Sequence, residues 1–102
     1  MTADEPLPEL NDAVLDPDQL SALFRDYRAY ASDMEILLRA RPGQVTLPLP
    51  MEDAPTLDQA RELLQSGGVR GVQIRYRYQE ASWWDTLMPV SGGVRLVRIK
   101  QQ

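Results

Sequence analysis

The sequence predicts an α+β fold: two helices packed on a three-stranded antiparallel β-meander, in a single domain over residues 16–102. Three observations indicate this class. Two segments in the first two thirds of the chain begin with a capping box and repeat apolar residues at helical spacing. The last third is rich in β-branched and aromatic residues, and short turn sequences divide it into three segments. With 102 residues, the chain has room for one domain.

Residues 1–15 precede the predicted domain as a flexible acidic tail. They combine acidic residues with two prolines and show no sustained periodicity. The start of the chain lacks the basic and apolar regions of a signal peptide. No apolar run reaches the ~20 residues that a membrane span requires. We therefore expect a cytoplasmic protein without a membrane segment.

The first helix begins at the sequence Asp-Pro-Asp-Gln of residues 16–19. The first aspartate serves as the N-cap, the proline suits the first helical position, and the glutamine completes a capping box. Apolar residues then follow one helical face as far as Leu38, and Arg-Pro-Gly at 41–43 ends the element. This pattern favours one long helix. The alternative is a helix that ends near Ser32 and is followed by a short strand over residues 36–38.

The middle of the chain predicts a weak strand and a second helix. Residues 44–49 alternate in part, but the proline at 48 lacks a backbone donor, so this segment is an edge strand or an extended connection. The second helix begins at Thr56, which forms a capping box with Gln59. It ends at the two glycines 67–68, as expected for a left-handed C-cap.

The final third predicts three strands, over residues 69–78, 82–90 and 94–100. Two-residue turns at Glu80-Ala81 and Ser91-Gly92 pair these strands so that alternate residues share a face. We expect the first face to lie under the helices, because it gathers most of the apolar residues: Val72, Ile74, Tyr76, Tyr78, Trp83, Leu87 and Leu96.

This register predicts two specific contacts. On the first face, Asp85 lies opposite Arg98 as a structural ion pair near the hydroxyl of Tyr76, because a buried charge requires a partner. On the second face, Arg77 stacks on Trp84. A slip of one residue loses both contacts.

The second face combines arginines with large apolar residues, the types that are enriched in protein interfaces. If both helices cover the first face, this one leaves an apolar patch of roughly several hundred Å² in water, a size that usually indicates binding. The alternative is that residues 1–15 or 44–49 cover it. We expect a non-catalytic accessory or regulatory protein that binds a protein partner, or a second copy in a homodimer, through Arg75, Arg77, Trp84, Met88, Arg95, Val97 and Ile99.

Single-stranded nucleic acid is the second candidate ligand for this face, because arginines and an exposed indole suit phosphate neutralisation and base stacking. A net charge of −4 argues against it. The charge is also uneven. Five arginines accompany thirteen acids in residues 1–68, whereas five arginines and one lysine accompany two acids in residues 69–102. This asymmetry makes head-to-tail self-association an option.

The composition leaves little for catalysis. The chain has no histidine and no cysteine, which removes the commonest general base, thiolate nucleophiles and the commonest ligands of transition metals. Glu52 and Asp53 are too few carboxylates for a hard-cation site. The glycine-rich residues 67–71 precede a strand, whereas phosphate-binding loops open a helix. We expect no catalytic residue, metal, cofactor or small-molecule substrate.

Overall fold

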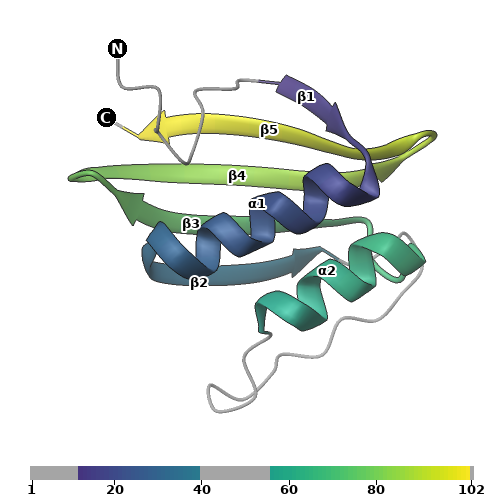
Figure 1. Ribbon diagram of the computed structural model, residues 1–102, viewed down its shortest axis with the longest axis horizontal. Helices are drawn as coiled ribbons and strands as arrows, with labels where there is room; N and C mark the ends of the chain where they lie inside the picture. Colours follow the sequence, from purple (N-terminus) through teal and green to yellow (C-terminus); the bar gives the residue numbers. More distant parts are fainter. Residues whose placement is uncertain (1–11, 40–55, 102) are drawn as a thin grey trace.

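The computed structural model describes residues 12–39 and 56–101. These residues form a five-stranded antiparallel sheet in the order β1-β5-β4-β3-β2, and both helices lie on one face of it (Figure 1). The α+β class is therefore confirmed, but the sheet has five strands where the sequence predicted three. In chain order the elements are β1 (Asp12–Leu15), α1 (Pro17–Tyr30), β2 (Ser32–Arg39), α2 (Leu57–Ser66), β3 (Gly71–Tyr78), β4 (Ala81–Val90) and β5 (Gly93–Gln101).

Helix α1 begins as predicted but ends earlier. The backbone N–H of Gln19 donates to the Asp16 carboxylate at 2.8 Å, and the Gln19 side chain accepts from the Asp16 N–H at 2.9 Å. The helix stops at Tyr30, and β2 then pairs along β3. The predicted long helix is wrong and the alternative strand is correct, because pairing with β3 packs Ile36 and Leu38 against the core.

Strand β1 occupies the last four residues of the segment predicted to be a flexible tail. It pairs antiparallel with Val94–Val97 of β5, which packs Ala13 and Leu15 against the core. These residues join the sheet because pairing with β5 buries every second side chain of the segment. The rest of the predicted tail, and the predicted edge strand at 44–49, lie outside the described residues.

Helix α2 has the predicted boundaries. The backbone N–H of Gln59 donates to the Thr56 hydroxyl at 3.2 Å, and the Gln59 side chain accepts from the Thr56 N–H at 2.9 Å. At the other end Gly67 adopts the left-handed conformation, with φ of 74°, and its N–H donates to the Leu63 carbonyl. Leu57, Ala60 and Leu64 are buried on the side that faces the sheet.

The β3–β4 hairpin turns at Gln79 and Glu80, one residue before the predicted turn. Both residues have positive φ, 50° and 63°, as the two central positions of a type I′ turn require. The predicted cross-strand partners are therefore wrong by two residues: Trp83 pairs with Tyr76 where Tyr78 was predicted, and Trp84 pairs with Arg75 where Arg77 was predicted.

This shift leaves every residue of the hairpin on its predicted face, because strand side chains alternate with a period of two. The second hairpin has the predicted register, with Leu87 opposite Leu96 and Asp85 opposite Arg98. The core fills the space between the helices and one face of the sheet. Its largest fully buried side chains are Tyr27, Leu20, Leu64, Ile74, Leu87, Leu96, Val72 and Asp85.

Candidate functional site

The face of the sheet that points away from both helices is the main candidate site, and we call it the outer face. Alternation along the strands places on it every residue that the sequence predicted for partner binding: Arg75, Arg77, Trp84, Met88, Arg95, Val97 and Ile99. Strand β1 adds Asp12 and Val14 to this face, since Ala13 and Leu15 point into the core. The predicted partner-binding set did not include these two residues, because their segment was expected to be a tail.

The outer face exposes a cluster of large apolar side chains, which we call the apolar patch. Ile99 is 57% exposed, Val14 55% and Trp84 36%, whereas Met88 and Val97 are partly buried. Trp84 lies opposite Ile99, and Val14 extends the patch across β5 to the edge of the sheet. The patch comprises Val14, Trp84, Met88, Val97 and Ile99.

Arg75 stacks on the indole of Trp84. Its guanidinium carbon lies 4.0 Å from the ring centroid, within the range of a cation–π contact. The same guanidinium donates through Nε to the Gln73 side chain at 2.9 Å and lies 3.6 Å from the Glu35 carboxylate. Arg75 therefore has both its charge and its planar face occupied by neighbours on the outer face. The sequence predicted this stacking for Arg77, and the shifted turn transfers it to Arg75.

Arg95 forms a two-point ion pair with Asp12. Its Nε and one terminal nitrogen donate to the two carboxylate oxygens at 3.0 and 2.6 Å. The hydrogen bonds from Arg95 lower the pKa of Asp12, and those to Asp12 raise the pKa of Arg95. This pair lies between Val14 and Val97, so the charge inside the apolar patch is neutralised within the chain.

Two other arginines of the outer face are exposed, Arg77 near the end of β3 and Arg39 at the end of β2. Neither side chain forms an ion pair with any residue in the described ranges. Both lie on the half of the sheet made by β3 and β2, away from β1 and β5. Among the described residues of the outer face, the arginines without an ion pair thus lie on one side of the apolar patch.

The opposite face holds a buried polar cluster around Asp85, which is 0% exposed. Arg98 donates to both oxygens of this carboxylate, at 2.9 and 2.8 Å. The hydroxyls of Tyr27 and Tyr76 donate to it as well, at 2.6 and 3.1 Å. Burial raises the pKa of both tyrosines, and the charge of Asp85 raises them further. Sequence reasoning anticipated Tyr76 but missed Tyr27, which reaches Asp85 from α1.

This cluster is sealed from substrates, because Asp85 and Tyr27 are fully buried and Arg98 is 3% exposed. A carboxylate with four such donors is compensated in place, which is the usual role of a buried ion pair. The cluster therefore joins α1 to β3, β4 and β5 and does not form an open active site.

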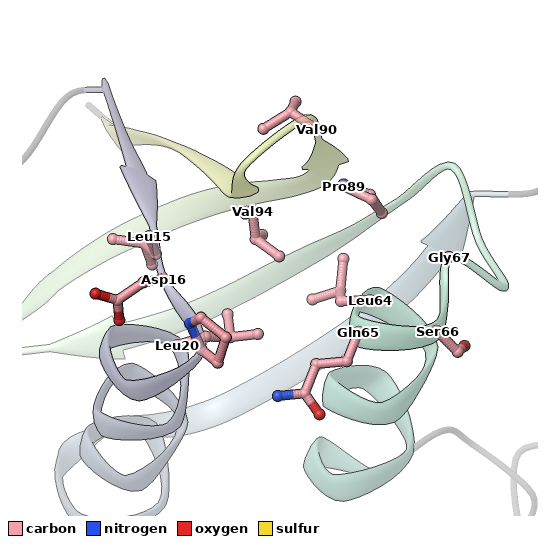
Figure 2. Close-up of a pocket in the computed structure, with 12 residues that line it drawn as sticks. Leu15, Asp16, Leu20, Leu64, Gln65, Ser66, Gly67, Pro89, Val90 and Val94 are labelled. Carbon is pink, nitrogen blue, oxygen red and sulfur yellow. The ribbon is translucent and has the colours of Figure 1, made fainter.

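A groove of about 450 Å³ opens at one end of the sheet, between the start of α1 and the end of α2 (Figure 2). Its walls are mainly apolar, and the Asp16 carboxylate at its rim is engaged in capping α1. Asp85 is not part of it. The residues that line it are Leu15, Asp16, Pro17, Leu20, Leu64, Gln65, Ser66, Gly67, Pro89, Val90, Gly93 and Val94.

Within residues 12–39 and 56–101, no group of three or more acidic, histidine or cysteine side chains is arranged to hold a metal ion. Glu52 and Asp53 lie outside the described residues. Neither α1 nor α2 has the length and apolar character needed to cross a membrane. No family model matches the chain, and neither a curated protein nor a solved structure matches it.

Proposed function

We propose that this chain is a non-catalytic accessory protein that binds another protein chain through the outer face of its sheet. The observation that supports it is the apolar patch, with Val14 and Ile99 more than half exposed on a sheet face that neither helix covers. An exposed patch of this kind on a small domain usually marks an interaction surface. The residue types also fit, since aromatic, methionine and arginine side chains are enriched in interfaces.

The contacts of the arginines favour a protein ligand over single-stranded nucleic acid. Base stacking needs a free aromatic face and phosphate binding needs free cations. Here Arg75 lies on the Trp84 ring and also near Glu35, and Arg95 is bound by Asp12. The two arginines without an ion pair, Arg77 and Arg39, lie towards opposite ends of neighbouring strands and so do not form a continuous track for a phosphate backbone. Nucleic acid would have to displace these contacts, whereas an apolar protein surface packs against them as they stand.

Site-specific photo-crosslinking in living cells tests this proposal. A photoreactive phenylalanine analogue replaces Ile99, the most exposed residue of the apolar patch, and in a matched protein replaces Tyr30. Tyr30 is a suitable control because it is 53% exposed but lies at the end of α1, on the helical side. We expect a discrete protein adduct from position 99 and none from position 30.

Once the crosslinked partner has been identified and purified, its affinity for this chain is measured directly. Ile99→Glu should weaken its affinity by about 10-fold or more, because it places a charge in an apolar contact, while Tyr30→Glu should leave it unchanged. The proposal fails if position 99 yields no adduct beyond that of position 30. Binding of a labelled single-stranded oligonucleotide that weakens with salt would overturn it in favour of nucleic acid.

A further inference from the structure

We infer that the partner on the outer face is a second copy of this chain, with the two sheets packed face to face about a two-fold axis. This inference rests on the proposed function and names the partner for the same surface. It follows from three properties of the outer face: where its charges are neutralised, where its free charges lie, and how large it is.

The arginines beside the apolar patch are paired with carboxylates of the same chain. Arg95 is bound at two points by Asp12, and Arg75 lies against Trp84 with Glu35 at 3.6 Å. About a two-fold axis the same surface lies on both sides, so an unpaired arginine near the axis would approach its own copy. An internally paired arginine avoids that repulsion, and it costs less to remove from water than a lone charge does. The patch is therefore compatible with its own copy.

The arginines of the outer face that have no ion pair lie where a second copy of the chain would leave them exposed to water. The apolar patch is centred on β4 and β5, which are next to each other in the sheet and carry four of its five residues. Arg77 and Arg39 lie on β3 and β2, towards opposite ends of those strands. A second sheet seated over β5 and β4 therefore places both arginines at the rim, where charges are well tolerated in interfaces.

The face is large enough for a stable dimer. Five strands spaced by ~4.8 Å, with strands of about eight residues, give a face of roughly 24 by 26 Å, or about 600 Å² in projection. A standard interface buries about 800 Å² of accessible surface on each partner. Specific interfaces begin at about 600 Å² per partner, and the projection of the face alone meets this lower limit. Two such sheets pack about 10 Å apart with interdigitated side chains.

Sedimentation equilibrium on the purified full chain tests the inference. We expect a species of twice the 11.6 kDa chain mass. Ile99→Glu should raise the dimer dissociation constant roughly 100-fold or more, since symmetry places the new carboxylate in the interface twice. Val14→Glu, at a position equally exposed in the monomer, should do the same. Tyr30→Glu should change the constant less than about 2-fold, with the circular dichroism of all three variants unchanged.

Salt separates this arrangement from head-to-tail pairing of the acidic and basic parts of the chain. The face-to-face dimer should persist in high salt, because the patch contains no unpaired charge and apolar burial does not weaken in salt. Dissociation by salt would overturn it.

Because the chain has no cysteine, single spin labels report the geometry. Labels at Val97→Cys should lie closer together in the dimer than labels at Tyr30→Cys, and the reverse order would overturn the face-to-face arrangement. A chain that stays monomeric at millimolar concentration overturns the second-copy assignment. In that case an adduct between position 99 and a different protein still supports the proposed function, whereas no adduct ends both.

Discussion

Removing the carboxylate of Asp85 should destabilise the fold more than any other single change in the polar cluster. In Asp85→Ala, the guanidinium of Arg98 remains 3% exposed and loses both of its hydrogen bonds to the carboxylate. The hydroxyls of Tyr27 and Tyr76 lose their acceptor as well. Breaking a buried ion pair by removing one partner typically costs about 3–5 kcal/mol. Since domains of this kind are stable by about 5–15 kcal/mol, this loss is between about a fifth and the whole of the free energy of unfolding.

Urea denaturation followed by tryptophan fluorescence and circular dichroism measures this cost, and a double variant tests its cause. Asp85→Leu with Arg98→Met replaces the pair by apolar side chains of similar size. It should recover at least half of the stability lost in Asp85→Ala, because the penalty arises from the uncompensated charge. A cost below about 1 kcal/mol for Asp85→Ala, or a double variant no more stable than the single one, would refute this reasoning.

Three further changes probe single contacts, each by urea denaturation. Tyr27→Phe should cost about 1–2 kcal/mol, and more than Tyr76→Phe, because its hydroxyl makes the shorter bond to the buried carboxylate; equal costs would contradict this. Gly67→Ala should cost about 1 kcal/mol, because φ there is 74° although the space is free; no cost would show that the helix end relaxes. The hydrogen bonds from Arg95 lower the pKa of Asp12 in the folded chain below its value in the unfolded chain. The ion pair therefore stabilises the fold at any pH above the unfolded-state pKa of Asp12, and this stabilisation is lost as the pH falls through the folded-state pKa. Asp12→Asn should therefore be less stable than wild type at neutral pH and equal to it in strong acid, and a difference that persists in acid would point to another cause.

Local signals in the sequence predicted a large part of this fold. Both helix starts were predictable, because a capping box lies within four residues of the chain and needs no tertiary contact. The faces of β3, β4 and β5 were predictable because alternation fixes the side on which each residue lies, whatever its partner. For that reason Trp84 and Ile99 were placed on the outer face although the first turn was predicted one residue late.

Other features had no local signal that decides them. Leu38 fits both the helical stripe that begins at Leu20 and a strand, and only the unpaired edge of β3 favours the strand. The turn at Gln79 and Glu80 contains no glycine or asparagine, so its left-handed conformations are not marked in the sequence. The pairing of Asp12 with Arg95 joins residues 83 positions apart. This contact neutralises the charge that lies between Val14 and Val97 in the apolar patch.

Local sequence patterns predicted the α+β class, the two helix starts and the face of each C-terminal strand residue, and the composition excludes histidine and cysteine chemistry. Helix capping and strand alternation depend on residues only a few positions apart, so a short stretch of sequence is enough to predict them. Contacts between distant segments determine that residues 12–15 and 32–39 complete the sheet, that Tyr27 joins the Asp85 cluster, and that the arginines beside Trp84 and Val97 are neutralised. These outcomes depend on which distant segments meet, because a strand needs a neighbour to satisfy its backbone and a buried charge needs a partner that the chain supplies from elsewhere.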